Sequence, residues 1–212
     1  MQLMSTPRAN YTAIKRVLDV TLASTALIAL SPVLLAIWLA VRLRLGSPAI
    51  FVQTRPGLHG RRFRMYKFRS MTDARDGSGR LLPDAERMTP LGRLLRRSSL
   101  DELPELWNVV KGDMSLVGPR PLLTEYLPFY TTEELRRHNV RPGITGLAQT
   151  QGRNALSWDE KFRLDLAYVD AMSISLDARI VLMTILKVLH RDGVLDAAPE
   201  GPLHAVRERR SA

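Results

Sequence analysis

Two adjacent carboxylates, Asp101 and Glu102, lie in the stretch Arg96-Arg97-Ser98-Ser99-Leu100-Asp101-Glu102-Leu103-Pro104. Pro104 suits the first turn of a helix, where a missing N–H costs little. Asp101 could cap that helix, or Ser99 could cap it with Glu102 as its capping-box partner. The positive end of a helix dipole favours an ionised carboxylate and also a bound phosphate. An ordinary capping box with solvated basic neighbours explains the stretch equally simply, because S-x-x-E is a common pattern.

Composition narrows the chemistry that these carboxylates could perform. The 212-residue chain carries a net charge of +10 and has a pI of about 10.6. This balance favours polyanionic partners: nucleic acid, anionic lipid headgroups or phosphorylated small molecules. There is no Cys, which excludes disulfides, thiolate nucleophiles and Cys-based metal sites, and the four His show no ligand-like spacing.

A long uncharged run near the N-terminus predicts a membrane element. From Val20 to Val41 no residue is charged, and as a straight helix this run would measure about 33 Å, enough to span a bilayer. Ser31-Pro32 should break it into two halves of about 15–18 Å. Basic residues flank both ends: Lys15, Arg16, Arg42 and Arg44. The positive-inside rule then favours a re-entrant helix that turns at Ser31-Pro32, with an ordinary kinked transmembrane helix as the alternative.

The segment after this run has strand-like character. Residues 49–52 and 63–68 flank a Pro- and Gly-containing loop at 56–60, which predicts a small β-hairpin. Basic side chains are dense here, and next to a membrane element we expect them to meet headgroups or phosphates. They are Arg55, Arg61, Arg62, Arg64, Lys67 and Arg69.

The remaining sequence predicts short amphipathic helices joined by rigid loops. A loop over 72–90 precedes helices at 91–97 and 104–110, and Lys111-Gly112 should end the second. The apolar run 177–190 is either a core helix or a membrane-surface helix. We expect an α+β, mostly helical fold in four parts: a flexible N-terminus (1–14), a membrane helix (15–45), a catalytic domain (46–193) and a disordered tail (194–212).

Several motifs in a fixed order make the chain resemble a known family. They are Lys15-Arg16-x-x-Asp19, Ser31-Pro32, Lys67-Phe68-Arg69-Ser70-Met71, Ser99 to Pro104, Asn108, Lys111 to Pro121, Arg141 to Gly146 and Gly152-Arg153-Asn154. Each is weak by itself, but together they resemble the bacterial sugar transferases, the monotopic phosphoglycosyl transferases. The chain is most similar to the minimal form, which lacks an additional multi-helix N-terminal domain.

This resemblance implies a reaction, a cofactor and a location. The enzyme would move a sugar-1-phosphate from a UDP-sugar to polyprenyl (undecaprenyl) phosphate with release of UMP, the first membrane step of glycoconjugate assembly. It would use Mg²⁺ on the cytoplasmic face of the bacterial inner membrane, with amphipathic interfacial helices around the catalytic core. The implied catalytic dyad is Asp101 and Glu102. The implied functional arginines are Arg96, Arg120 and Arg153, to which we add Lys67 and Arg69 as phosphate-binding candidates.

Two positions depart from the family pattern. Leu147 stands where Trp is frequent, and Thr150-Gln151 stands where Val-Asn is common. These departures concern the choice of sugar and local membrane contact, while the residues expected to perform the chemistry are all present.

The proposed chemistry needs these residue types. A carboxylate that attacks a phosphorus surrounded by anionic oxygens requires a metal ion and arginines to neutralise charge. Mg²⁺ binds one or two carboxylates together with phosphates and water. We therefore expect Asp101 to be the nucleophile, forming an aspartyl-phosphosugar intermediate, and Glu102 to be a metal ligand or local base. The sequence leaves open which carboxylate holds the metal.

Two other functions are compatible with parts of the sequence. A membrane-tethered basic module could bind nucleic acid or lipid, although aromatics make up only 6 % and no nucleic-acid-reading motif occurs. A phosphohydrolase could use the same dyad with water. We expect a UDP-sugar, polyprenyl phosphate and anionic membrane lipids as partners, and no nucleic acid. The sequence leaves homodimerization, the sugar and the glycoconjugate pathway open.

Overall fold

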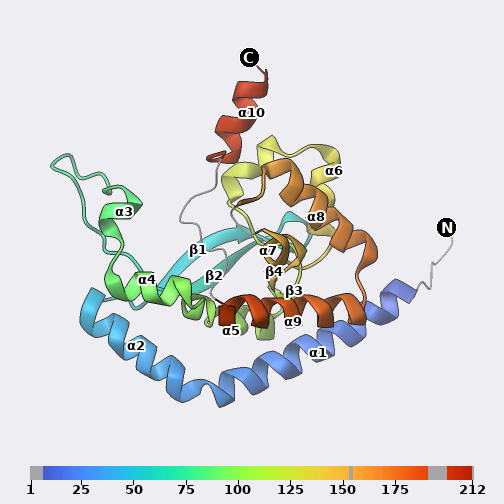
Figure 1. The fold of residues 1–212 in the computed structure, drawn as a ribbon, viewed down its shortest axis with the longest axis horizontal. Helices are drawn as coiled ribbons and strands as arrows, with labels where there is room; N and C mark the ends of the chain where they lie inside the picture. Colours follow the sequence, from blue (N-terminus) through green and yellow to red (C-terminus); the bar gives the residue numbers. More distant parts are fainter. Residues whose placement is uncertain (1–6, 153–154, 191–199, 212) are drawn as a thin grey trace.

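The computed structural model describes residues 7–152, 155–190 and 200–211. A long bent helix pair runs beneath a mixed domain, and a C-terminal helix lies at the opposite end (Figure 1). The helices are α1 (Pro7–Ala29), α2 (Ser31–Leu45), α3 (Asp84–Arg87), α4 (Pro90–Arg97), α5 (Glu105–Lys111), α6 (Thr132–Leu135), α7 (Leu147–Gln151), α8 (Trp158–Ala171), α9 (Ile174–His190) and α10 (Leu203–Ser211). Short 3₁₀ turns are η1 (Leu58–Gly60), η2 (Leu100–Glu102), η3 (Thr124–Phe129) and η4 (Arg136–Asn139). The strands are β1 (Ile50–Pro56), β2 (Arg62–Phe68), β3 (Ser115–Val117) and β4 (Gly143–Thr145).

The predicted break in the N-terminal run is present at Ser31-Pro32. Helices α1 and α2 meet there at 64°, and the Ser31 hydroxyl donates a 2.8 Å hydrogen bond to the carbonyl of Ile28. No single described helix is long and apolar enough to cross a bilayer, whereas the bent pair together has the required length and composition. Helix α1 begins at Pro7, so the prediction of a flexible segment through residue 14 is wrong for its second half.

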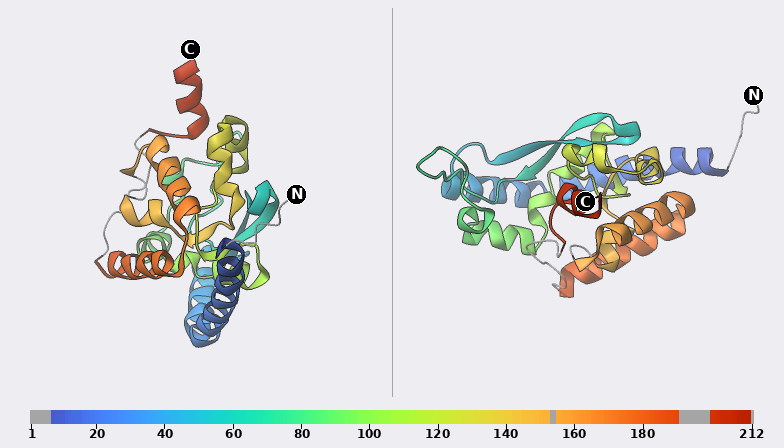
Figure 2. Two further views of the ribbon diagram at one scale, coloured as in Figure 1. Left: turned by 90° about the vertical axis from the view of Figure 1, so that its right-hand side faces the viewer. Right: turned by 90° about the horizontal axis from the view of Figure 1, so that it is seen from above.

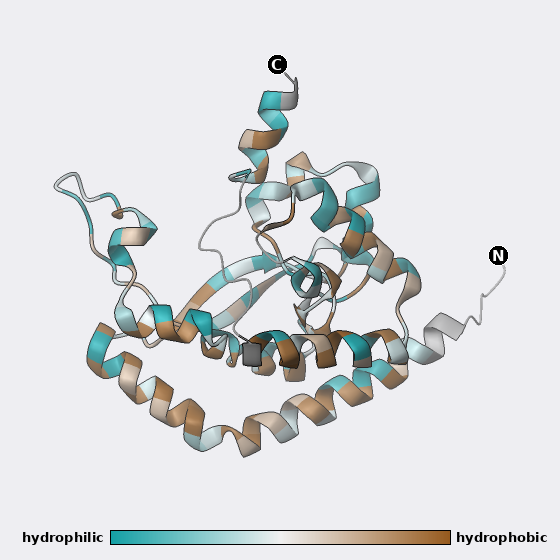
Figure 3. Cartoon of the chain, viewed as in Figure 1, coloured by the Kyte–Doolittle hydropathy of each residue, from teal (hydrophilic) through white to brown (hydrophobic). Residues whose placement is uncertain are grey.

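The two ends of this helix pair attach to the same domain. Arg16 in the N-terminal half of α1 donates to the carbonyls of Val109 and Val110 at the end of α5, over 2.6 and 2.9 Å. At the other end, Val41 of α2 is fully buried in a cluster with Phe68 and Leu95. Many apolar side chains of the two helices stay exposed, and much of the arc around the bend is brown in Figure 3. They include Val17, Leu22, Ile28, Leu35 and Leu43.

The predicted hairpin is confirmed. Strands β1 and β2 pair antiparallel with Phe51 opposite Lys67, Gln53 opposite Met65 and Arg55 opposite Phe63. Because directly opposed residues share one face of a sheet, these six side chains lie together. Phe63 and Met65 are buried on this face, so the polar residues Gln53, Arg55 and Lys67 lie next to a packed core.

A second, parallel sheet was not predicted. Strand β3 pairs with β4 through Ser115–Gly143 and Val117–Thr145, and each strand has only three residues. Glycines permit this approach, because a Cβ on Gly143 would lie 2.1 Å from the nitrogen of Gly118. A Cβ on Gly146 would lie 2.2 Å from the carbonyl oxygen of Gly118. The loops that follow both strands are therefore held in backbone contact.

The C-terminal part of the chain corrects the predicted disordered tail. Residues 191–199 and 212 lie outside the described residues, but α10 is helical from Leu203. Leu203 and Val206 are buried against an aromatic cluster that includes Tyr126, Trp158 and Phe162. The sequence of α10 is only weakly apolar and does not by itself predict a helix. Packing against this cluster explains why the segment is helical.

Candidate functional site

Glu102 is the centre of the predicted site. Lys67 Nζ and Arg120 Nη2 approach the same oxygen, Glu102 Oε1, at 2.6 and 2.5 Å. These two cations lower the pKa of Glu102 well below its usual range, in spite of the opposing effect of burial. Within the described residues, the second oxygen, Oε2, accepts no hydrogen bond and remains available for another ligand.

Asp101 lies next to this cluster with only 7 % of its surface exposed. Its carboxylate makes no hydrogen bond or ion pair with any described residue, and burial followed by the neighbouring Glu102 charge raises its pKa. The predicted capping roles are wrong: Ser99 has φ 56° and makes no cap bond, and both acids lie in the turn η2. This left-handed residue turns the chain sharply after α4 and so places Asp101 against the interior.

A third carboxylate, Glu105, was not among the predicted site residues. It is 2 % exposed, and its Oε1 lies 3.1 Å from Lys67 Nζ without hydrogen-bond geometry. Burial and the Glu102 charge raise the pKa of Glu105 to about 7. The spacing Glu102-x-x-Glu105 could have indicated it, because residues three apart share one helical face.

Helix α5 is fixed to the hairpin by Asn108, which is fully buried. Its side chain accepts a 3.1 Å hydrogen bond from the Tyr66 N–H and donates a 2.7 Å bond to the Arg64 carbonyl. An amide that satisfies backbone groups of a neighbouring strand sets the register between the two elements. Asn108 thereby fixes the distance between Lys67 on β2 and the acids before α5.

Arg120 reaches the site from the rigid loop after β3. The Pro119 carbonyl accepts a 3.0 Å bond from the Gly143 N–H, and the Arg120 carbonyl accepts a 2.6 Å bond from Arg137 Nη2. Arg137 is itself paired with Asp165 of α8 at 2.7 Å, and both are 3 % exposed. Arg137 and Asp165 are positioning residues that the sequence interpretation missed, since nothing in their local spacing distinguishes them.

The other predicted phosphate-binding residues differ in how many of their donors already have a partner. Arg96 is exposed and donates a 3.0 Å bond to the Ser70 hydroxyl, which leaves most of its guanidinium free. Arg69 is bound to the carbonyls of Met71 and Ser47 and to Asp73, so its donors already have partners. Arg153 lies outside the described residues.

A cavity of about 1260 Å³ joins these groups. Seen from above, the hairpin lies on one side and α8 and α9 lie on the opposite side (Figure 2). Six predicted site residues line the cavity: Lys67, Arg69, Arg96, Asp101, Glu102 and Arg120. The structure therefore brings the predicted dyad and most of the predicted phosphate-binding cations to a single cavity.

The donor set fits a magnesium ion that binds together with a phosphorylated substrate. Asp101 and Glu102 Oε2 are two carboxylate donors free of hydrogen bonds within the described chain. No group of three or more His, Asp or Glu with ligand geometry occurs among the described residues. Mg²⁺ takes one or two carboxylates with phosphates and waters in the remaining positions, so two carboxylate donors suffice for this ion.

A model of the family described as "Bacterial sugar transferase" matches residues 10–191, which is most of the chain. The chain belongs to the bacterial sugar transferase family. It is 56 % identical over 181 residues to the "Uncharacterized sugar transferase EpsL" of Bacillus subtilis, covering 85 % of this chain and 90 % of that protein. The matched range includes Lys67, Asp101, Glu102 and Arg120 of the cavity.

Relatives with named reactions are also similar to this transferase. A "UDP-glucose:undecaprenyl-phosphate glucose-1-phosphate transferase" of Caulobacter vibrioides is 41 % identical over 88 % of this chain and 73 % of its own length. The "Undecaprenyl-phosphate galactose phosphotransferase" of Salmonella typhimurium is 39 % identical over 85 % of this chain. This chain spans 41 % of that Salmonella protein. The named relatives are transferases that use undecaprenyl phosphate, and this chain is likewise a transferase.

Proposed function

We propose that this transferase moves a sugar-1-phosphate from a UDP-sugar to undecaprenyl phosphate and releases UMP. The observation that carries the proposal is Asp101: a buried carboxylate without a partner among the described residues, on the wall of a cavity whose neighbouring cations bind Glu102. The printed names of relatives support the class of donor and acceptor.

Asp101 would act as the nucleophile in two displacements. One carboxylate oxygen attacks the sugar-bearing phosphorus, the bond between that phosphorus and the UMP oxygen breaks, and UMP leaves with the bonding electrons. A phosphate oxygen of the lipid then attacks the same phosphorus, and the bond to Asp101 breaks to regenerate the carboxylate. Burial favours this role because a poorly solvated carboxylate has less hydration to lose in the attack.

The cations beside the dyad would bind the phosphate oxygens. Arg120 presents a planar fork, which matches phosphate geometry, and Arg96 carries an exposed guanidinium at the cavity wall. Asp101 and Glu102 would hold Mg²⁺, which when bound supplies positive charge at the diphosphate. Lys67 keeps Glu102 ionised and fixed in orientation.

The helix pair α1–α2 would place this site at the membrane surface. Both of its ends bind the catalytic domain, through Arg16 at one end and Val41 at the other. A single pass across the bilayer would separate these ends, so a re-entrant pair is the arrangement that keeps both contacts. Exposed apolar residues of α9 add a second interfacial surface on the same molecule, and they are Ile174, Val181, Leu182, Ile185 and Leu186.

The test is UMP release from a panel of UDP-sugars, measured with and without undecaprenyl phosphate and with and without Mg²⁺. We expect one donor to give UMP and a lipid-linked product in stoichiometric amounts. Asp101→Asn should abolish turnover and also the covalent protein–phosphosugar adduct seen by mass spectrometry. Asp76→Asn is the matched control, because Asp76 lies in a solvent-exposed loop away from the cavity lining.

Three outcomes would contradict the proposal. UMP release without any lipid product would indicate a phosphohydrolase. Normal turnover in Asp101→Asn would exclude this residue as the nucleophile. Turnover in the presence of a chelator would exclude the magnesium role.

A further inference from the structure

The basic side chains of the cavity differ in whether they have an acidic partner. Lys67, Arg69, Arg87, Arg120 and Arg137 each form an ion pair with a carboxylate. Three cations of the lining form none within the described chain: Arg55, Arg96 and Lys161. Arg96 has a place in the proposed reaction, whereas Arg55 is a half-buried guanidinium that has no role in that reaction. Among the described residues it is attracted by Glu105 and Glu125 without forming an ion pair with either.

Arg55 lies on the sheet face that carries the site. It is opposite Phe63, on the same face as Gln53 and Lys67, and it donates a 2.6 Å hydrogen bond to Gln53 Oε1. This bond directs the side chain along the strand toward the Lys67 end of the hairpin. Its Nε is buried and has no hydrogen-bond partner. A guanidinium held in this way keeps donors available for an anion that the protein does not itself supply.

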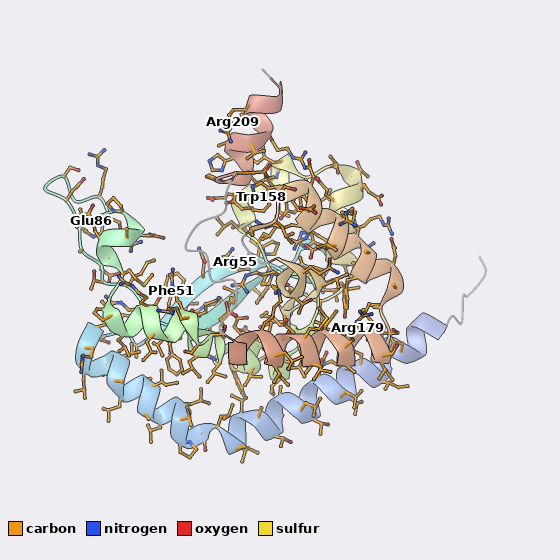
Figure 4. All side chains as sticks on the ribbon, in the orientation of Figure 1. Phe51, Arg55, Glu86, Trp158, Arg179 and Arg209 are labelled. Atoms are coloured by element: carbon orange, nitrogen blue, oxygen red, sulfur yellow. The ribbon has the colours of Figure 1, made fainter. Side chains whose placement is uncertain are left out.

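The surroundings of Arg55 favour an anionic ligand. Burial, followed by the charge of the nearby Arg120 guanidinium, lowers the pKa of Arg55 to about 10. Two cations that repel each other in one cavity are stabilised when a phosphate binds near both. In Figure 4, Arg55 lies above α9, on the side of the molecule away from α1 and α2. This is the water-facing side in the proposed membrane arrangement.

We propose that Arg55 binds the phosphate of the nucleotide leaving group, UMP. The inference rests on the proposed function, in which the sugar-bearing phosphorus lies at Asp101 and the UMP phosphate lies one bridging oxygen further into the cavity. Arg120, paired with Glu102, would serve the reacting phosphorus, and Arg55 would serve its neighbour. The lipid phosphate is the other phosphate source, but it must enter from the side of α1 and α2.

The experiment measures UMP binding by calorimetry on the full-length protein in detergent, together with steady-state kinetics for both substrates. Arg55→Gln should weaken UMP binding by about tenfold or more, the effect of losing one charge-assisted hydrogen bond. It should raise the KM for the UDP-sugar and leave the KM for undecaprenyl phosphate unchanged. Arg55→Lys keeps the charge and the aliphatic stem but loses the planar fork. Its UMP affinity should therefore lie between those of wild type and Arg55→Gln.

Arg62→Gln is the matched control, because Arg62 lies on the same hairpin, is exposed and is absent from the cavity lining. Thermal unfolding of each variant separates loss of binding from loss of fold.

Unchanged UMP affinity in Arg55→Gln would overturn the assignment, and an equal loss of UMP affinity in Arg62→Gln would reduce it to a general charge effect. A raised KM for the lipid alone would assign Arg55 to the lipid phosphate instead. UMP binding through Arg55 without any lipid product would contradict the proposed reaction and leave the assignment standing.

Discussion

Arg137 donates a 2.6 Å hydrogen bond to the backbone carbonyl of Arg120. The same guanidinium is paired with Asp165 of α8 and is 3 % exposed. A buried ion pair far along the chain therefore fixes the loop that carries a site arginine. The buried charge of Arg137 is compensated by Asp165 and by hydrogen bonds that it donates to the Arg120 carbonyl and the Tyr130 hydroxyl.

Asp165→Asn should destabilise the protein strongly. The change leaves Arg137 buried without a counterion, and breaking such a pair costs on the order of 3 kcal/mol. Urea unfolding measures the loss. Asp170→Asn is the matched control, because the Arg136–Asp170 ion pair is exposed and should contribute little. Equal stability of Asp165→Asn and wild type would show that the pair is dispensable.

Arg120→Lys should reduce turnover although it preserves the charge. Lysine has no planar fork, so it cannot hold Glu102 and a phosphate oxygen in the same geometry. We expect a loss of about tenfold or more in kcat/KM, the cost of one charge-assisted hydrogen bond, and a larger loss for Arg120→Ala. The initial rate of UMP release is the measurement. Activity of Arg120→Ala within twofold of wild type would exclude a role in phosphate contact.

Local patterns predicted those parts of the structure whose causes are local. The hairpin, the break at Ser31-Pro32 and the C-cap at Gly112, with φ 93°, follow from strand alternation, a missing N–H and a glycine requirement. The Ser99 cap was wrong because this residue lies in the left-handed region, which its residue type does not predict. Arg137 and Asp165 were missed because 28 residues separate them in sequence.

In the candidate site, too, the features with local causes were predicted and those that depend on distant parts of the chain were not. Asp101 and Glu102 were recognisable as neighbours in a motif. The structure pairs Lys67 and Arg120, which were predicted to bind phosphate, with Glu102, and this pairing was not predicted. The orientation of Asp101 depends on the left-handed turn before it, which its local sequence does not encode. The parallel pairing of β3 with β4 also escaped prediction, since strands of three residues carry no periodic signal.

His138 should make stability fall at mildly acidic pH. Burial, followed by the adjacent Arg137 charge, lowers the pKa of His138 to about 4 from a usual value of 6.5. Between these pH values the unfolded chain binds the extra proton, so stability decreases as pH falls from 6.5 toward 4. The contribution is up to ~3 kcal/mol. Urea unfolding at several pH values should show a smaller loss over this window for His138→Gln than for wild type.

A second histidine provides the control for the pH dependence of stability. His59 is exposed, so His59→Gln should leave the acid dependence of wild type unchanged. Identical pH profiles for wild type and His138→Gln would show that His138 is protonated in the folded protein without cost.

The N-terminus and the C-terminal helix should lie on the same side of the membrane. Native Cys is absent, so single Cys residues at position 5 and at position 205 can be labelled in intact cells with an impermeant reagent. Both should stay unlabelled until the membrane is permeabilised. Replacing Ser31 by Ala and Pro32 by Leu restores a continuous helix, and we expect a mixture of re-entrant and spanning forms, because the positive flanks still oppose translocation. Labelling at position 5 alone in the native background would demonstrate a spanning helix.

The contact of Gly118 with Gly143 and Gly146 limits how these two segments can be exchanged between relatives. A Cβ at any of these three positions would lie within 2.4 Å of a backbone atom of the opposite loop. Exchanging residues 115–121 with those of a relative therefore imposes that relative's backbone path on residues 141–146. Chimeras with a relative should exchange both segments together.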